Sequence, residues 1–200
     1  MSQKTKIAWK ELLYSKTLVG KNDSHKIAYI AVMTAFLVVA NMFFEFKLAE
    51  TQFSFTLLIS ALTGIIIGPI FGFAAAFLGD LVGFLYHSSG FAYMPWVGIS
   101  LGVTAMLSGF VVNGIPSKSG WFRYVKLALV CLLTFLICTV GINTTAFWLT
   151  IQLGKMDYWS YLVYRLFAQG QIWNSLANYV LLFISVPALG KIKPLGIKIQ

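Results

Sequence analysis

The sequence predicts an all-α membrane protein in which six transmembrane helices form one compact bundle. Hydrophobic residues make up 58% of the 200-residue chain and charged residues only 10%, whereas a soluble domain carries about 25% charged residues. The stretch 53–86 contains a single charged residue, Asp80. One helix of that length would run about 51 Å, well beyond a hydrocarbon core of about 30 Å. Gly68 and Pro69 interrupt the stretch, which predicts two spans joined by a tight turn.

The spans follow from apolar stretches that alternate with short polar ones. A polar N-terminal arm, 1–26, precedes a single membrane domain, 27–189, and a basic tail, 190–200, follows it. The expected spans are 27–44, 53–67, 70–86, 96–112, 124–148 and 164–189. A short polar loop with Glu45, Lys47 and Glu50 is expected between the first two spans.

The basic residues are distributed unevenly between the two ends of these spans. Twelve of the 15 lysines and arginines fall in the arm, the tail and the loop between spans four and five, where Lys126 is expected at the helix edge. Lys47, Lys155 and Arg165 fall on the opposite side. Because cytoplasmic loops are enriched in Lys and Arg, both termini are expected in the cytoplasm, with the bundle in a prokaryotic plasma membrane. This topology accounts for the net charge of +9, so no nucleic-acid partner is expected.

The sequence offers little that suits catalysis. The pattern G-x-S-x-G occurs around Ser100, but inside an apolar helix, and neither His25 nor His87 is placed to act as its base. No metal-ligand or phosphate-binding motif occurs, so no catalytic residue, metal or cofactor is expected. Cys131 and Cys138 share one apolar span and are expected to be packing thiols. A membrane enzyme that uses Ser100 stays a minor alternative.

Polar side chains inside apolar spans are costly and therefore indicate sites. Asp80 is the clearest acid, and its simplest role is to hold helices together through a hydrogen bond or an ion pair. Arg165 is the clearest cation; it either extends to the outer interface or binds a ligand, and the amides that follow it favour the ligand. The residues expected to bind the ligand are Arg165, Gln169, Gln171, Asn174, Asn143, Trp96 and Trp173. One cation among amides and aromatic rings suits a planar or amphipathic organic anion.

Four features together resemble the substrate-binding S component of energy-coupling factor (ECF) vitamin transporters, over about residues 26–189. The chain has the size and the six expected spans of that family, and its first span carries Ala31-x-x-x-Ala35. Segment 61–80 is a glycine-proline hairpin that ends in Gly-Asp. Segment 141–165 is most similar to the folate/pantothenate-type branch.

The resemblance implies a protein that binds one vitamin, docks on a transmembrane coupling protein with two ATP-binding cassette ATPases, and reorients in the membrane to release the vitamin. Ala31 and Ala35 would form the docking surface. Folate-type members carry a basic pair near the sixth span, where this chain has Arg165 alone. One cation suits the single carboxylate of pantothenate better than the two of folate, and both vitamins stay open. A stand-alone secondary transporter or channel for a small organic solute is the alternative.

Overall fold

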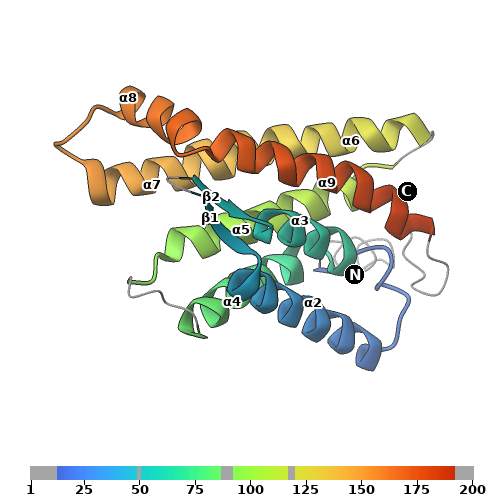
Figure 1. Cartoon of the computed structure of the whole chain (residues 1–200). Helices are drawn as coiled ribbons and strands as arrows, with labels where there is room; N and C mark the ends of the chain where they lie inside the picture. Colours follow the sequence, from blue (N-terminus) through green and yellow to red (C-terminus); the bar gives the residue numbers. More distant parts are fainter. Residues whose placement is uncertain (1–12, 49–50, 87–91, 117–119, 192–200) are drawn as a thin grey trace, which may run out of the picture.

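The computed structural model describes residues 13–48, 51–86, 92–116 and 120–191, with the backbone alone for 45–48 and 51–52. Within these residues the chain is helical apart from its turns and one two-stranded hairpin (Figure 1). The α-helices are α2 (Asp23–Phe43), α3 (Thr56–Ile67), α4 (Pro69–Tyr86), α5 (Pro95–Gly109), α6 (Gly120–Leu133), α7 (Thr145–Phe147), α8 (Tyr158–Val163) and α9 (Gln171–Lys191). Four segments are π-helical, namely η1 (Phe110–Gly114), η2 (Thr134–Thr144), η3 (Trp148–Gln152) and η4 (Tyr164–Ala168).

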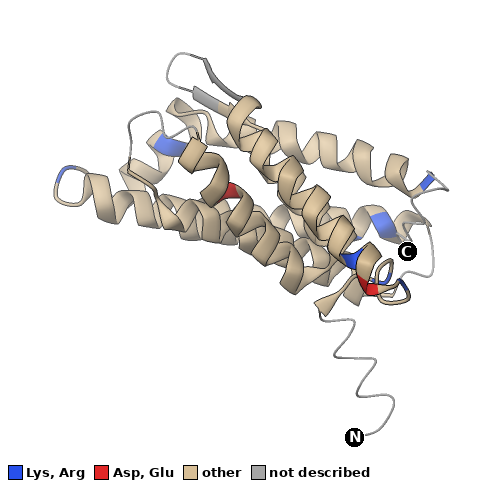
Figure 2. Cartoon of the chain, turned by 90° about the horizontal axis from the view of Figure 1, so that it is seen from below, with Lys and Arg blue, Asp and Glu red and all other residues tan. Residues whose placement is uncertain are grey.

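Five helices in the described part of the chain are long and apolar enough to cross a membrane, as expected of an all-α, multi-pass membrane protein. They are Asp23–Phe43, Pro69–Tyr86, Pro95–Gly114, Gly120–Gln152 and Gln171–Lys191. The predicted second span differs, because α3 has only 12 residues and a length of about 18 Å. Lysines and arginines of the described residues gather near the two ends of the bundle (Figure 2).

The predicted polar loop between the first two spans is instead a β-hairpin. Strands β1 (Glu45–Leu48) and β2 (Thr51–Ser54) pair antiparallel, with Glu45 opposite Ser54. The sequence of β1 alternates polar and apolar residues, which is the signal of a strand. The second span therefore begins at Thr56, after the strand, and not at residue 53.

The predicted sixth span, 164–189, is two helical segments rather than one. It breaks between η4 and α9, where Gly170 has a φ of 69°. A residue with a Cβ rarely adopts this conformation, and glycine commonly ends a helix in this way. The fifth span is longer than predicted and unbroken, because η2 continues α6 with wider π-helical turns.

Helix α3 is the centre of the bundle and packs against α2, α4, α5 and α9. Nine of its 12 residues are buried. A Cβ added at Gly64 would lie 1.7 Å from the carbonyl oxygen of Ala105 in α5, so no side chain has room there. The glycine therefore brings the two backbones into contact, as small residues do between membrane helices.

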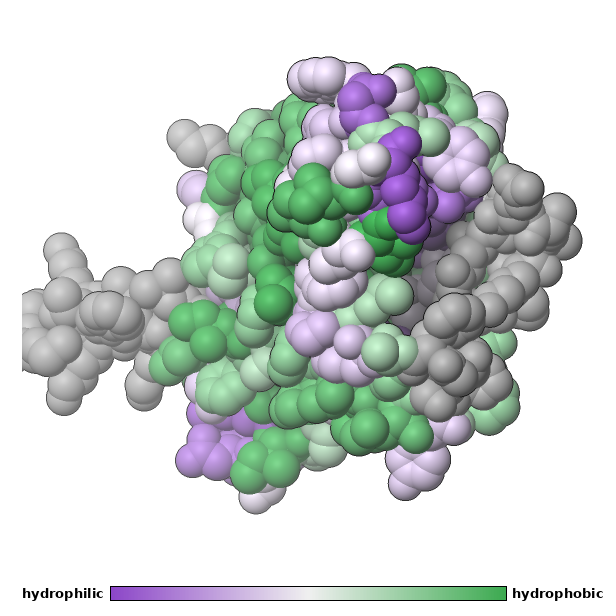
Figure 3. Space-filling view, turned by 90° about the vertical axis from the view of Figure 1, so that its left-hand side faces the viewer, coloured by the Kyte–Doolittle hydropathy of each residue, from purple (hydrophilic) through white to green (hydrophobic). Residues whose placement is uncertain are grey.

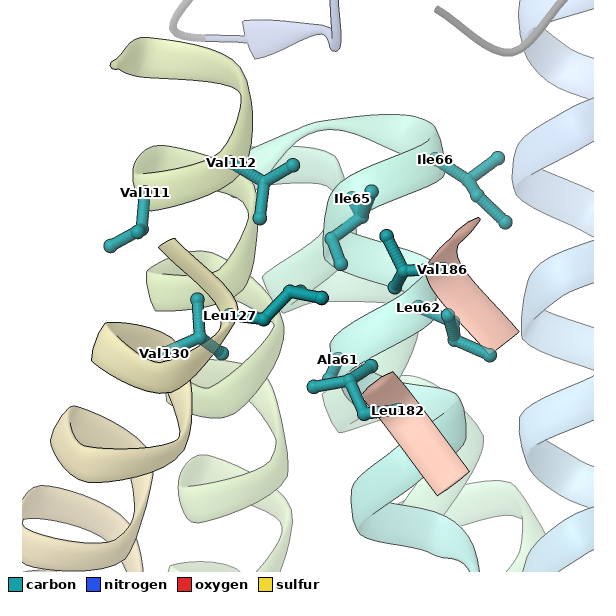
Figure 4. Close-up of a cluster of buried hydrophobic side chains, with 10 residues drawn as sticks. All are labelled: Ala61, Leu62, Ile65, Ile66, Val111, Val112, Leu127, Val130, Leu182 and Val186. Carbon is teal, nitrogen blue, oxygen red and sulfur yellow. The ribbon is translucent and has the colours of Figure 1, made fainter. Parts of the chain in front are cut away.

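One apolar cluster joins α3 to η1, α6 and α9 (Figure 4). Its buried members are Ala61, Leu62, Ile65, Ile66, Val111, Val112, Leu127, Val130, Leu182 and Val186. These side chains fill the space between the early and late parts of the chain, so α3 connects the two halves of the fold.

Two asparagines of α9 hold the beginning of α3. Asn178, which is 1% exposed, accepts a hydrogen bond from Leu58 N at 3.0 Å and donates one to Ser54 O at 2.8 Å. Asn174 accepts from Ser54 N at 3.1 Å. The first amides of a helix have no partner within the helix, and Asn178 supplies the acceptor for that of Leu58, while Asn174 binds the end of β2.

The end of α3 is held by the N-terminal arm. Ser15 donates to Ile67 O from its backbone nitrogen at 2.7 Å and to Ile66 O from its hydroxyl at 2.5 Å. The ring of Tyr14 stacks on Phe71 of α4 at 4.7 Å between centroids. The described end of the arm thus packs into the bundle, while residues 1–12 of the predicted arm lie outside the described residues.

Asp80 hydrogen-bonds to two other parts of the bundle. Asn41 of α2 donates to its Oδ1 at 2.8 Å, and Tyr93, just before α5, donates to its Oδ2 at 3.1 Å. Burial and the nearby carboxylate raise the pKa of the Tyr93 phenol, so the phenol stays protonated and continues to donate. Asp80 therefore connects α4 to α2 and to the residues just before α5.

Lys126 lies inside the protein, with 2% of its surface exposed, and not at the helix edge where the sequence analysis counted it. Its ammonium donates to the carbonyl oxygens of Val112, at 3.3 Å, and Ile115. These carbonyl oxygens lie at the end of η1, where no further amide of the helix can donate to them. The ammonium of Lys126 donates to them instead. The charge asymmetry therefore rests on one lysine fewer at the membrane surface.

Replacing Asn178 with leucine keeps a side chain of similar size but removes its amide. We expect Asn178→Leu to lower the free energy of unfolding by about 2–4 kcal/mol, because Leu58 N and Ser54 O lose their partner inside the protein. Thermal and denaturant unfolding in detergent micelles measures the change. Asn22→Leu is the matched control, since Asn22 is exposed and makes no capping hydrogen bond with its side chain. Equal stability of the two variants would contradict the assignment.

Gly68 has a φ of 125° at the turn between α3 and α4, and a Cβ there would lie 2.5 Å from Ser15 N. We expect Gly68→Ala to cost about 2 kcal/mol or more, through backbone strain and loss of the contact with the arm. Gly114→Ala is the control, because a Cβ there has no atom within 4 Å. A melting temperature of Gly68→Ala equal to that of Gly114→Ala would show that the close contact at the turn is not required.

Candidate functional site

Two contacts join α5 to the helix that contains η2 and α7, at the end of the bundle away from Gly68. The indole of Trp96 meets the ring of Phe147 edge-on at 5.9 Å between centroids. Asn143 Nδ2 lies 2.9 Å from Ser100 Oγ. Trp96 and Ser100 are four residues apart on α5, and Asn143 and Phe147 are four residues apart on the facing helix. The four side chains therefore face the same space between the two helices.

Arg165 also contacts the ring of Phe147. Its guanidinium carbon is 4.1 Å from the centroid of that ring, and Nη1 donates to the Tyr161 hydroxyl at 3.3 Å. Helix α8 begins after Asp157, whose carboxylate accepts from Ser160 N at 2.9 Å, and this start places Tyr161 and Arg165 one turn apart. Both side chains are buried, Arg165 with 7% exposed, so its guanidinium does not extend to the surface.

We name this group the Phe147 cluster; its members are Trp96, Ser100, Asn143, Phe147, Tyr161 and Arg165. Within the described residues, four buried side-chain nitrogen or oxygen atoms lack a hydrogen-bond partner, and three of them belong to this cluster. They are the donors Trp96 Nε1 and Arg165 Nε and the acceptor Asn143 Oδ1. Buried polar atoms are nearly always paired in native proteins, so three unpaired atoms together indicate a place for a bound molecule.

No acidic side chain neutralises the guanidinium in this part of the chain. Among the described residues, no carboxylate forms an ion pair with Arg165. The described residues do contain an ion pair, but it joins Lys26 to Asp23 in α2. The ring of Phe147 provides a cation–π contact, which offsets a fraction of the cost of burying the charge. An anion bound beside Arg165 would offset the remaining cost of burying its charge.

The other residues predicted to bind the ligand are spread more widely. Trp173 is 57% exposed and faces outward. Asn174 accepts a hydrogen bond from Ser54 N at the end of β2. Gln169 and Gln171 flank the break at Gly170 and are half-buried. The structure therefore brings Arg165, Asn143 and Trp96 together and places the remaining predicted residues outside their cluster.

Sequence reasoning missed Phe147 and Tyr161 and treated Ser100 only as a possible nucleophile. Phe147 is one of 17 phenylalanines, so its residue type alone does not mark it as a site residue. The sequence feature that could have pointed to it is its position four residues after Asn143, which places both on one helix face. Tyr161 stands in the same way four residues before Arg165. The Ser100 hydroxyl contacts Asn143 and the carbonyl of Cys138, at 3.4 Å, in place of a catalytic base.

The surface around this site is mixed in character. Figure 3 looks at the end of the bundle that includes the α7–α8 connection and shows hydrophilic residues gathered on one side among apolar surface. A shallow hollow there is lined by Trp159, Ser160, Val163 and Tyr164, none of which belongs to the Phe147 cluster. No group of three or more His, Cys, Asp or Glu residues in the described part of the chain could hold a metal ion.

Comparison with known proteins agrees with this architecture. Residues 21–192 match the family described as "ECF-type riboflavin transporter, S component". A solved structure entitled "Crystal structure of FolT bound with folic acid" is similar with a TM-score of 0.60 and 20% sequence identity, over 78% of this chain and 89% of that one. A search of curated proteins found no match. Because the family match spans most of the chain, the protein belongs to the S components of ECF-type transporters, which are transport subunits and not enzymes.

Proposed function

We propose that this S component binds a B vitamin that carries a carboxylate, pantothenate or folate, at the Phe147 cluster. The observation that supports this most is the buried guanidinium of Arg165, which has no carboxylate partner among the described residues. Burying an unpaired charge is expensive unless the binding partner supplies the opposite charge. A carboxylate beside Arg165 would also give its unpaired Nε an acceptor.

The number of charges favours pantothenate over folate. The cluster has one cation, Arg165, and pantothenate has one carboxylate, whereas folate has two. The perpendicular rings of Trp96 and Phe147, at 84°, offer an aromatic surface that also suits the flat pterin of folate. Riboflavin, which the family's description names, has no carboxylate and would leave Arg165 without a counter-ion.

Family membership also implies association with an ECF module. We infer that this module consists of a transmembrane coupling protein and two ATP-binding cassette ATPases, and that ATP hydrolysis there drives reorientation of this chain in the membrane. Ala31 and Ala35 are exposed on α2, and only Leu37 and Ala40 of that helix are buried. An exposed face with small residues lets a partner helix approach closely, which supports docking at this face.

Arg165→Ala is expected to weaken binding of the vitamin at least tenfold, which corresponds to about 1.4 kcal/mol. Isothermal calorimetry of the purified protein in detergent, against pantothenate, folate and riboflavin, measures the change. Arg123→Ala is the matched control, because Arg123 also has a buried unpaired Nε but lies near the start of α6, away from the cluster.

Either of two results would overturn the proposed site. Unchanged affinity of Arg165→Ala would remove the guanidinium from the site. Riboflavin binding in place of both carboxylate vitamins would refute the proposed ligand class. Thermal unfolding of each variant shows whether a loss of binding reflects a loss of the fold.

Replacing both Ala31 and Ala35 with tryptophan should leave vitamin binding intact but abolish uptake, since bulky rings would keep a partner helix away from α2. Radiolabelled uptake into proteoliposomes that contain the whole module measures this. The control is the double change Val180→Trp and Ile184→Trp, at two exposed positions four residues apart on α9. Normal uptake by the α2 variant would exclude this docking surface. ATP-independent uptake by the chain alone would instead support a stand-alone transporter.

A further inference from the structure

The guanidinium of Arg165 is fixed at one of its three nitrogens. Nη1 donates to the Tyr161 hydroxyl at 3.3 Å, and the two residues are one turn apart along α8 and η4. Tyr161 is only 3% exposed, so packing restricts its ring. The backbone that carries Tyr161 is also fixed, because the carboxylate of Asp157 accepts from Ser160 N at 2.9 Å. The hydroxyl is therefore a stationary partner for one end of the guanidinium.

A ring from another helix covers the same guanidinium. The guanidinium carbon lies 4.1 Å from the centroid of Phe147, which is contact distance. Trp96 of α5 meets Phe147 edge-on, with 84° between the ring planes, so Phe147 is itself held in place. The ring therefore limits how far the guanidinium can turn about the bonds of its own side chain.

These two contacts leave one edge of the guanidinium unused. All its N–H groups lie in one plane, so a bond at one nitrogen and a ring against the group together determine where the other N–H groups point. Nη1 lies on the side of Cδ, and the opposite edge carries the N–H of Nε and one N–H of Nη2. Nε is buried and has no hydrogen-bond partner among the described residues. Two parallel N–H groups of this kind match the two oxygens of a carboxylate.

We propose that Tyr161 and Phe147 are positioning residues, which hold Arg165 so that its Nε–Nη2 edge binds the ligand carboxylate side-on. The hydroxyl occupies the nitrogen that this edge does not need, and the ring limits the rotation that would turn the edge away. The site then prefers a planar carboxylate to a neutral group of similar size. The inference rests on the proposed function, because it assumes that a carboxylate binds at Arg165, and it adds how that carboxylate is recognised.

The test measures how strongly the protein prefers a carboxylate to a neutral analogue. Calorimetry on the full chain in detergent compares pantothenate with pantothenol, in which an alcohol replaces the carboxylate, and folate with its diamide. Wild type should bind the carboxylate form about tenfold more tightly or better. Tyr161→Phe and Phe147→Leu should each reduce this ratio by about threefold or more, whereas Phe147→Tyr keeps the ring and should keep the ratio. Tyr158→Phe is the matched control, because its hydroxyl contacts Thr145 and not Arg165.

Arg165→Lys separates recognition by an edge from attraction by a charge. Lysine keeps the positive charge but has no pair of parallel N–H groups in a fixed plane, so most of the preference should be lost. Full retention of the ratio in Arg165→Lys would overturn the side-on geometry. A ratio in Tyr161→Phe equal to or above that of wild type would show that the hydroxyl competes for the guanidinium and does not position it.

A spectrum of the wild-type protein tests the same edge without a change at the site. The chain has two arginines, Arg123 and Arg165. Labelling with ¹⁵N-arginine therefore gives two Nε–H signals, which Arg123→Ala assigns. The Arg165 proton signal should move downfield when the vitamin binds, because its N–H gains a carboxylate partner, and the Arg123 signal should not move. An unmoved Arg165 signal in a sample saturated with vitamin would refute the edge assignment, whether or not the variants fold.

Failure of this inference is distinct from failure of the proposed function. If neither vitamin binds wild type, or if Arg165→Ala binds as well as wild type, the proposed function fails. If Arg165→Ala loses binding while Tyr161→Phe and Phe147→Leu keep the wild-type ratio, the positioning roles are wrong and the function stands.

Discussion

The central helix α3, about 18 Å long, is too short to cross a hydrocarbon core of about 30 Å, and the free backbone groups at both of its ends find partners inside the protein. Unpaired amides and carbonyls are costly in an apolar medium, and membrane folds satisfy nearly all of them internally. Asn178 supplies the partners at the start of α3, and Ser15 supplies them at its end. Asn113 adds a hydrogen bond to Ile65 O at 3.1 Å. The N-terminal arm, η1 and α9 are therefore fixed around α3 by polar contacts as well as by apolar packing.

This constraint divides the bundle into two ends of different character. At the α3–α4 turn, the backbones of Gly68 and Ser15 lie too close for any side chain, and the apolar cluster of α3, η1, α6 and α9 fills the neighbouring space. The other end contains η3, η4 and the end of η2, all π-helical, and three buried polar atoms there have no partner in the described residues. Wide helical turns and unpaired groups occur often at functional sites, because both have a cost that a ligand can offset. The end with the Phe147 cluster is thus the better suited to binding.

The sequence predicted well what depends on hydropathy and on single special residues. Five of the six expected spans overlap long apolar helices, and the turn at Gly68–Pro69 is where expected, since burial in lipid and the chemistry of proline act locally. Asn174 shows the limit: a helical pattern places it on the same face as Asn178, but cannot reveal that this face meets the start of α3. The η2 segment shows another limit, because apolar composition does not distinguish π-helical from α-helical turns. Phe147 could not be recognised by its residue type, because its role comes from contacts with two other segments of the chain, α5 and η4.

The described part of this bundle buries three ionic groups, Asp80, Lys126 and Arg165, and their surroundings explain why only Arg165 is suited to a ligand. Asp80 accepts hydrogen bonds from Asn41 and Tyr93, which distribute its charge over two other segments and hold α2, α4 and the start of α5 together. Arg165 has five donor hydrogens but one hydrogen-bond partner, the Tyr161 hydroxyl, among the described residues, and an aromatic ring covers its guanidinium. A carboxylate inside a protein is stable once its oxygens accept enough hydrogen bonds, whereas a guanidinium with an unpaired nitrogen stays costly until an acceptor arrives. The charge of Asp80 is thus used within the fold, whereas the guanidinium of Arg165 has no counter-ion among the described residues, as the proposed binding role requires.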